Sequence, residues 1–463
     1  MTKLKAGLLP LYIKLYDDIN PVWRKPLEAY VGKISAALGK LGVEIETVPV
    51  CRIKPEFERA VKTLEGKGLD ALMTLHLAYS PSLESSSILA KTCLPLIILD
   101  TTPDFAFGPD STPDLIMNNH GIHGVQDMCN LLLRNNKPFA IEAGHWEKSD
   151  VLRRVADQVR AARLASVMRS ARVGLIGKPF AGMGDFSVPS GKLRKTLGVT
   201  TVAVPPSSVG RLLPGTNDAI VKQERLNDLE RYDCGGLDKT AHLQSIRTGI
   251  AVERFIARGK LTAVTLNFQE VTKKSGLPVM PFLGMCKAMA NGSGYAGEGD
   301  VLTAALVGSL MRVYPETSFT EMFCPDWKGG RVFLSHMGEI NPMLAEKKPK
   351  LYVRDPWSFS DAAPPVSVGA CFKPGKALFV NLAPGYSGYT LIAAPVTMVS
   401  GGKNRKFDHT VSGWFKPELP LSDFLEEYSR AGGTHHAALV YSASIQALSA
   451  FSRLMKIQFK VIK

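Results

Sequence analysis

Three short segments of the chain combine ionisable side chains with residue types that let them bind cations or transfer protons. The first, Gly292–Asp300, places Glu298 among four glycines, directly before an Ala- and Leu-rich helix expected at Val301–Val313. Glycines permit unusual dihedral angles and close backbone approach, and the N-terminus of a helix favours a nearby anion. The alternative is a simple glycine-rich turn with a capping carboxylate.

The second segment, Thr317–Pro342, carries Glu321 and, fifteen residues later, His336. It lies where helical periodicity gives way to short apolar stretches, and ligand sites are common at junctions between domains. A histidine beside an apolar strand is nevertheless more often a hydrogen-bonded core residue than a ligand. This segment alone therefore does not identify a site.

The third segment, Ala431–Tyr441, contains the adjacent pair His435 and His436 before an apolar stretch. Neighbouring side chains in a strand point to opposite faces, so we expect only one of the two to enter a given site. Taken alone, such a pair is a weak signal.

Together the three segments supply two carboxylates and two imidazoles, a mixed oxygen and nitrogen shell suited to Mn²⁺ or a similar cation. Four protein ligands leave room for two substrate oxygens in a six-coordinate shell. A cation bound to two oxygens of an open-chain sugar acidifies the proton on the adjacent carbon. One carboxylate can then remove that proton while a second group transfers protons to and from the sugar oxygens, which gives an enediol.

Composition sets outer limits on these hypotheses. At 463 residues the chain is too long for one ordinary core, so two or three domains are expected. No apolar run is long enough for a membrane span, and the N-terminus lacks the pattern of a secretory signal, which favours a cytoplasmic protein. The seven cysteines form no Cys-x-x-Cys pair, which argues against a thiolate zinc site and a disulfide framework.

The formal charge of +14 raises the question of nucleic-acid binding. The basic residues form no single stripe interleaved with aromatic residues, so no nucleic-acid partner is expected. A solvated basic surface is the simplest interpretation, and a positive cleft for an anionic small substrate is the alternative.

The pattern along the chain predicts an α/β protein followed by a β domain. Strands are predicted at Val43–Val50, Leu69–Leu75, Leu94–Leu99, Pro138–Ile141, Arg172–Ile176 and Ala263–Asn267, and helices at Pro55–Leu64, from near His120, at Asp150–Arg169 and at Lys239–Arg258. Such alternation favours parallel sheets covered by helices. After about residue 325, short apolar stretches broken by Gly and Pro predict a mostly antiparallel domain, such as a barrel.

At these residues the chain resembles the L-arabinose isomerase and L-fucose isomerase superfamily, and its arabinose branch most closely. The strongest similarities are in Gly294–Val307, Thr317–Glu321, Leu334–Pro342 and Ala431–His436, and weaker ones in Thr74–Pro81, Asn118–Gly124 and Ala143–Trp146. These segments keep the family's order and cover the chain from about residue 70 onward.

The resemblance implies two Rossmann-like α/β/α domains, at 1–170 and 171–315, and a C-terminal antiparallel β-barrel domain at 316–463. It implies a metal-dependent aldose–ketose isomerase of a pentose, deoxyhexose or related sugar, with Mn²⁺ as the cofactor and Co²⁺ or Mg²⁺ as alternatives. The metal ligands would be Glu298, Glu321, His336 and His436, with the two glutamates also acting as acid/base pair. The protein would be a homo-oligomer, hexameric or trimer-based, with active sites between subunits.

The same resemblance suggests substrate-binding residues. His123 would match a histidine that enters the active site of a neighbouring subunit. Met183 would match a residue of the central domain that contacts the substrate. His76, His435 and Lys14 are further candidates for substrate contacts, and Lys14 lies in a stretch that departs from the family pattern.

The residues expected to line the substrate site, here called the substrate wall, depart from the family pattern. Leu8–Asp18 carries Tyr12, Lys14 and Tyr16 where arabinose isomerases have a Gly-Ser-Gln-His motif, and Met322 stands where that branch usually has aspartate. L-Arabinose itself is therefore not assumed. We hypothesise that Lys14 contributes a positive wall for a modified or anionic sugar; the alternative is a surface lysine.

Two other functions remain open at this stage. A metal-dependent epimerase of a sugar or sugar acid would use the same four ligands, because it also removes a proton beside a carbonyl. A non-catalytic sugar-binding or regulatory homologue would keep the fold without turnover, although a pure binder has little need for a paired acid and base.

Overall fold

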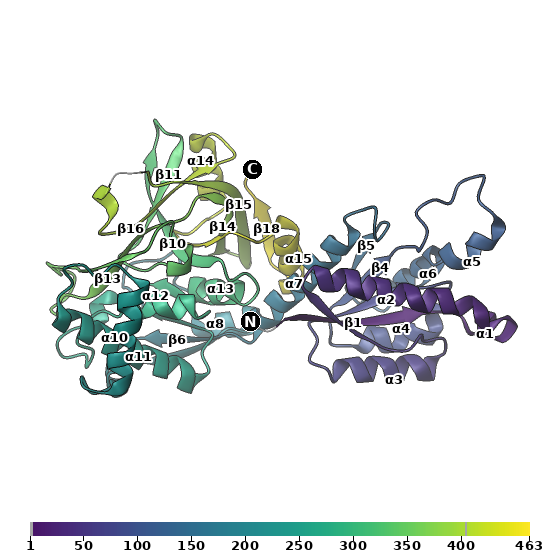
Figure 1. The fold of residues 1–463 in the computed structure, drawn as a ribbon, viewed down its shortest axis with the longest axis horizontal. Helices are drawn as coiled ribbons and strands as arrows, with labels where there is room; N and C mark the ends of the chain where they lie inside the picture. Colours follow the sequence, from purple (N-terminus) through teal and green to yellow (C-terminus); the bar gives the residue numbers. More distant parts are fainter. Residues whose placement is uncertain (1–2, 403–404) are drawn as a thin grey trace. The chain divides into compact units, whose positions relative to one another are not determined.

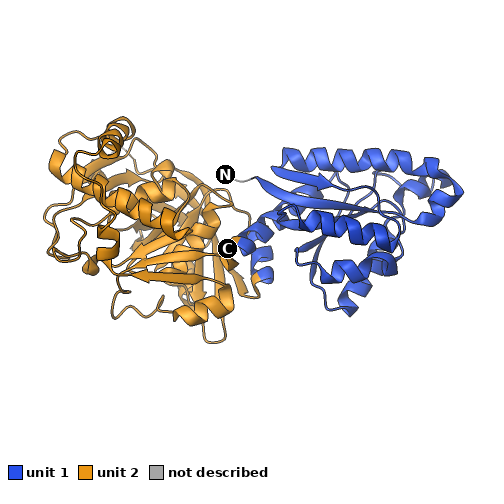
Figure 2. Cartoon of the chain, turned by 90° about the horizontal axis from the view of Figure 1, so that it is seen from below, with its two compact units in different colours: residues 1–166, 446–454 blue, residues 167–445, 455–463 orange. Residues whose placement is uncertain are grey.

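The computed structural model describes residues 3–402 and 405–463, and the chain divides into two compact units (Figure 2). The first unit, blue in Figure 2, comprises residues 1–166 and 446–454, and the second, in orange, comprises residues 167–445 and 455–463. None of the helices within the described ranges is both long and apolar enough to cross a membrane. The expected division into three domains stays a prediction.

The first unit is built on a parallel sheet, as the alternating pattern predicts. Its strands lie in the order β2, β1, β3, β4, β5, and each neighbouring pair runs parallel. The bounds are β1 Leu4–Leu11, β2 Val43–Thr47, β3 Ala71–His76, β4 Leu96–Asp100 and β5 Phe139–Ala143. Strand β2 is shorter than the predicted Val43–Val50 because Pro49 has no N–H to donate to a ladder.

Helices cover both faces of this sheet (Figure 1). In β1, Leu8 packs with residues of α2 and α7 on one face, whereas Leu9 packs with residues of α3, α4 and α6 on the other. The helices of this unit are α1 Lys14–Ile19, α2 Lys25–Lys40, α3 Lys54–Glu65, α4 Ser82–Lys91, α5 Ile116–Asn119, α6 Ile122–Arg134, most of α7 Val151–Arg169 and most of α15 Ile445–Met455. Burial on both faces explains the nearly continuous apolar runs of the strands.

The second unit contains a further parallel sheet in the order β7, β6, β8, β9. Its strands are β6 Arg172–Ile176, β7 Thr200–Val204, β8 Ala263–Leu266 and β9 Gly294–Gly297. The accompanying helices are α8 Ser190–Leu197, α9 Pro206–Gly210, α10 Ala219–Arg231, α11 Lys239–Gly259, α12 Phe282–Ala290 and α13 Val301–Met311. Strand β9 escaped prediction because glycine is depleted in strands.

The predicted antiparallel barrel is confirmed in the C-terminal part of this unit. Strands pair around the ring β16, β11, β10, β17, β14, β15, and the pairing of β15 with β16 closes it. The ring strands are β10 Thr317–Asp326, β11 Arg331–Ser335, β14 Gly375–Pro384, β15 Tyr389–Val399, β16 Val411–Pro417 and β17 His436–Val440. Attached to the ring are β12 Lys350–Val353, β13 Val366–Cys371, β18 Gln458–Val461 and helix α14 Leu421–Arg430.

Helix α13 joins the parallel sheet to the barrel (Figure 1). It is buried along its whole length, and it packs on β8 and β9 as well as on β10, β14 and β17. Close packing on β9 requires glycine, because a Cβ at Gly294 would lie 2.3 Å from the backbone nitrogen of Gly308 in α13. The residues between β9 and α13 are therefore held beside the barrel, and Glu298 is among them.

Candidate metal centre

Glu298 occupies a constrained position between β9 and α13. Its φ of 61° is left-handed, which is uncommon for a residue other than glycine, and such backbone conformations cluster at functional sites. The backbone N–H of Phe180 donates a 2.8 Å hydrogen bond to the carbonyl of Glu298. The simple capping turn is not what forms here, because Asp300, rather than Glu298, accepts from the N–H of Thr303 and caps α13.

Glu321 and His436 face each other across two barrel strands. In the β10–β17 register they are direct partners, and on its other side Glu321 pairs with Ser335 of β11. Directly opposite residues of an antiparallel pair project to the same face. His336 directly follows Ser335, the last residue of β11, and its ring lies with Glu321 and His436 in one group.

The ligand atoms form two overlapping groups that share His436. One atom each of Glu321, His336 and His436 lie within 4.8 Å of one another, and the same holds for Glu298, His435 and His436. The structure thus brings the four predicted ligands to one location and adds His435. Among the described residues, Nε2 of His436 is a buried atom without a hydrogen-bond partner, and it lies 3.5 Å from Glu298 Oε2. A buried, unpartnered nitrogen beside carboxylates fits a metal ligand.

Two buried carboxylates hold the imidazole rings from behind. Asp300 Oδ2 lies 3.1 Å from Nδ1 of His436, and Glu339 Oε2 lies 2.7 Å from Nδ1 of His336. The hydroxyl of Tyr295 donates a 2.5 Å hydrogen bond to Glu339 Oε1. Histidines that bind metals usually donate their other N–H to a carboxylate in this way.

Sequence reasoning missed Asp300, Glu339 and Tyr295, although a usable signal was present. Asp300 stands two residues after Glu298, and Glu339 three residues after His336. Because metal-binding histidines commonly have a carboxylate partner, acidic residues inside the motifs of the ligands were reasonable candidates.

Aromatic rings enclose the same imidazoles. Phe319 lies edge-on to His336 and His436, with ring centroids 4.8 Å and 5.0 Å apart, and Phe186 stacks on His436 at 5.3 Å and 13°. Such contacts restrict ring rotation and exclude water. Met183, the predicted substrate contact, lies three residues before Phe186 on the same loop and is partly buried. Neither phenylalanine was singled out from the sequence.

The two glutamates differ in their electrostatic surroundings. Burial raises the pKa of Glu321, and the nearby imidazoles only partly oppose this effect. Burial also acts to raise the pKa of Glu298, but the contact with His435 and the charge of His436 and of other imidazoles lower it below its ordinary value. Opposite shifts in neighbouring carboxyls are typical of an acid/base pair.

His435 has its own acidic partner, Asp185. Burial would lower the pKa of His435, but contacts with Asp185 and Glu298 raise it to about 10. Burial would raise the pKa of Asp185, yet its bonds with His435 lower it to about 2. At neutral pH the pair is therefore an imidazolium bound to a carboxylate.

The other predicted substrate residues belong to the first unit. His76 ends β3, where burial lowers its pKa to about 3, and within the described residues neither ring nitrogen has a hydrogen-bond partner. His123 is exposed on α6 and stacks on Tyr79, with centroids 4.8 Å apart. Lys14 begins α1 and lies 2.5 Å from Asp18, so a neighbouring carboxylate balances its charge.

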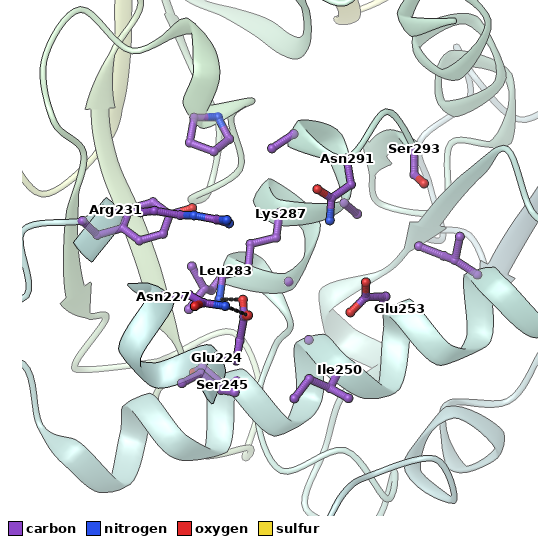
Figure 3. A pocket seen from close by; sticks show the side chains of 18 of the residues that line it. Glu224, Asn227, Arg231, Ser245, Ile250, Glu253, Leu283, Lys287, Asn291 and Ser293 are labelled. Atoms are coloured by element: carbon purple, nitrogen blue, oxygen red, sulfur yellow. Dashed lines mark hydrogen bonds and ion pairs between the residues drawn. The ribbon is translucent and has the colours of Figure 1, made fainter. Parts of the chain in front are cut away.

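A separate cavity of about 860 Å³ lies among α10, α11 and α12 and contains none of the candidate ligands (Figure 3). Inside it, Nζ of Lys287 lies 2.6 Å from Glu224 and 2.5 Å from Asp228. Asp228 in turn contacts His242 at 2.9 Å. Because these charges are paired within the protein, the network links the three helices and points to no particular ligand.

Comparison with known proteins identifies the family. Residues 222–315 match the model of the L-arabinose isomerase central domain, and residues 316–458 match that of the L-arabinose isomerase C-terminal domain. The L-arabinose isomerase of Shouchella clausii is 27% identical over 363 residues, covering 76% of this chain and 73% of the relative. That of Geobacillus stearothermophilus is 27% identical over 385 residues, covering 80% and 76%.

Solved structures add little to this comparison. A periplasmic sugar-binding protein from Legionella pneumophila aligns with 67% of this chain and 95% of its own at 11% identity, with a TM-score of 0.17 that is too low to support a conclusion. The sequence relatives and the two domain models, which follow one another along the chain, are the informative matches. By these similarities the chain belongs to the L-arabinose isomerase-like family.

Proposed function

We propose that this chain is a metal-dependent aldose–ketose isomerase that acts on a pentose, deoxyhexose or related sugar through an enediol. The observation that carries the proposal is the convergence of four side chains: Glu298 from the turn between β9 and α13, Glu321 from β10, His336 from the residue after β11, and His436 from β17. The relatives' shared name, L-arabinose isomerase, supports an aldose–ketose conversion.

The proposed metal ligands are Glu298, Glu321, His336 and His436. Their two carboxylates and two imidazoles suit a cation of borderline hardness, with Mn²⁺ preferred and Co²⁺ or Mg²⁺ as alternatives. In support, each imidazole has its Nδ1 beside a buried carboxylate, which leaves Nε2 as the ligand atom. When bound, the cation would supply Lewis-acid polarisation of adjacent sugar oxygens.

Glu298 and Glu321 are proposed as the acid/base pair. The lowered pKa of Glu298 keeps it ionised at neutral pH, so it is the better candidate to accept the proton from the sugar carbon. The raised pKa of Glu321 makes it the better proton donor in the absence of the cation. The surrounding rings of Phe319 and Phe186 would keep water away from the transferred proton.

The substrate and the assembly are further parts of the proposal. We assign substrate contacts to His123, Met183, His76, His435 and Lys14. We also propose a homo-oligomer, hexameric or trimer-based, with active sites between subunits, and domains at 1–170, 171–315 and 316–463. Sedimentation of the full chain measures the assembly; a monomer at assay concentrations would contradict it.

The deciding experiment is a ketose-formation assay on metal-stripped protein with and without added Mn²⁺. The panel should include pentoses, hexoses, deoxysugars and acidic sugars, with L-arabinose as one member. We expect Mn²⁺-dependent conversion of at least one sugar and none by the Glu298→Gln variant.

Other outcomes of the same assay identify the competing functions. An aldose product with deuterium incorporated from heavy water would indicate an epimerase. Sugar binding without any turnover by the metal-loaded protein would indicate a non-catalytic homologue. Conversion that does not depend on metal would contradict the proposed centre.

A further inference from the structure

A single loop of the second unit contacts both histidines of the His435–His436 pair. Residues 177–189 form this loop, which leaves β6 and leads into α8. Phe186 stacks on His436 at 5.3 Å, and the preceding Asp185 is hydrogen-bonded to His435. His436 begins the barrel strand β17 and His435 directly precedes it, so the loop connects the parallel sheet to the barrel at the candidate centre.

Asp185 holds His435 through one carboxylate oxygen. Its Oδ2 accepts a 3.0 Å hydrogen bond from the backbone N–H of His435 and lies 2.5 Å from Nδ1 of the same residue. Two contacts to one oxygen fix both the backbone and the rotation of the ring. The remaining nitrogen, Nε2, must therefore point away from Asp185.

Nε2 of His435 is not occupied by a close protein partner. It lies 3.5 Å from Oε2 of Glu298, which is longer than the ordinary hydrogen-bond range of about 2.7–3.2 Å. The side chain of His435 is 29% exposed and that of Asp185 37%, whereas that of His436 is fully buried. His435 therefore lies on the accessible side of the centre, where a sugar has to enter.

We propose that Asp185 is a positioning residue that holds His435 so that Nε2 hydrogen-bonds a sugar hydroxyl outside the pair of oxygens at the metal. The inference rests on the proposed isomerase function and adds a residue to its substrate site. It predicts that Asp185 affects sugar binding through His435 and leaves metal binding intact. Asp185 was not among the residues suggested by the sequence or by the family motifs.

The test is a double-mutant cycle on the accepted sugar with Asp185→Ala, His435→Ala and the double variant. We expect each single change to raise KM about tenfold, which corresponds to about 1.4 kcal/mol, with a smaller effect on kcat. Because Asp185 acts through His435, the double variant should be no worse than His435→Ala alone. The affinity for Mn²⁺, measured by calorimetry without sugar, should stay within about twofold of wild type.

Glu427→Ala provides the matched control, because Glu427 is a carboxylate of similar exposure, 43%, that pairs with Lys460. Its KM should equal that of wild type. Additive effects of Asp185→Ala and His435→Ala, an unchanged KM, or a large loss of Mn²⁺ affinity in Asp185→Ala would each overturn the assignment. Absence of turnover by wild type across the sugar panel would overturn the isomerase proposal itself, and with it this role.

Discussion

Asp300 uses its two carboxylate oxygens for different partners. Oδ2 lies 3.1 Å from Nδ1 of His436, and Oδ1 accepts a 2.8 Å hydrogen bond from the backbone N–H of Thr303. One side chain thus caps α13 and determines which nitrogen of His436 carries the proton. Because a backbone N–H can only donate, the atom of residue 300 that faces Thr303 must be an acceptor.

Asp300→Asn is therefore expected to weaken Mn²⁺ binding severely. The amide oxygen of the new asparagine must accept the hydrogen bond from the N–H of Thr303, so the amide NH₂ faces Nδ1 of His436. Nδ1 then accepts, the ring proton moves to Nε2, and the nitrogen proposed to bind metal is blocked. We expect a loss of affinity of about 100-fold, measured by calorimetry on metal-stripped protein.

Glu339→Gln is the matched comparison at the other imidazole. In the wild type, the carboxylate oxygen of Glu339 that does not face His336 is bonded to the hydroxyl of Tyr295, which can donate or accept. The amide can therefore rotate and keep its oxygen on Nδ1 of His336, so we expect a loss of about tenfold or less. Equal losses in Asp300→Asn and Glu339→Gln, or a larger loss in Glu339→Gln, would contradict this account.

A second prediction concerns the acid/base pair. Glu298→Gln or Glu321→Gln should lower kcat by about 100-fold or more, because general acid–base catalysis contributes about 10²–10⁴-fold. Both changes conserve volume, so thermal unfolding of the metal-stripped variants should stay close to that of wild type. A variant with kcat near wild type and weakened Mn²⁺ affinity would show that this glutamate only binds metal.

The sequence was informative where chemistry and periodicity are local. The parallel sheets follow from apolar runs alternating with helices, and the barrel from short apolar stretches after about residue 325. Glu298, Glu321, His336 and His436 could be selected because they lie in distinctive motifs. Their convergence could not be derived, since it depends on the register that pairs Glu321 with His436 and on the path of α13.

What the sequence did not provide are the contacts between distant segments. Asp185 precedes His435 by 250 residues, and the link between them exists only because a loop of the parallel sheet reaches the barrel. Strand β9 was not predicted because it is rich in glycine. Glycine is needed there because α13 packs closely against the strand. The pairing of Lys14 with Asp18 was visible in the i, i+4 spacing and weakens the hypothesis of a positive substrate wall.

A third prediction separates the two adjacent histidines. His436→Ala should weaken Mn²⁺ affinity more than His435→Ala, because His436 belongs to both groups of candidate ligands and its buried Nε2 has no hydrogen-bond partner within the described residues. Calorimetric titration with Mn²⁺ compares the two variants, and circular dichroism checks that each is folded. The reverse order of affinities would show that His435 is the ligand.

A fourth prediction uses the space around His336. A Cβ at Gly297 would lie 2.7 Å from Cε1 and 2.8 Å from Nε2 of that imidazole. Gly297→Ala should therefore displace the ring and weaken Mn²⁺ affinity by about tenfold or more. Gly191→Ala, on α8 with no atom within 4 Å of the added Cβ, is the control and should bind Mn²⁺ like wild type. Equal affinities in the two variants would show that the ring can shift without loss of the site.

The last prediction is a pH dependence of stability in the metal-stripped protein. Folding raises the pKa of His435 from 6.5 to about 10 and lowers that of Asp185 from 3.8 to about 2. The raised pKa contributes stability that is complete below about pH 6.5 and lost as the pH rises through about 10. The lowered pKa contributes stability that is complete above about pH 4 and lost as the pH falls through about 2.

The difference in Tm between wild type and Asp185→Ala should therefore be largest between about pH 4 and 6.5 and shrink towards pH 10. Thermal unfolding in a series of buffers measures it. The His435→Ala background supplies the control: there, the same Asp185→Ala change should show no such decline above about pH 6.5, because the titrating imidazole is gone. A difference in Tm that stays constant with pH in both backgrounds would mean that the contact between Asp185 and His435 does not depend on the charge of the imidazole.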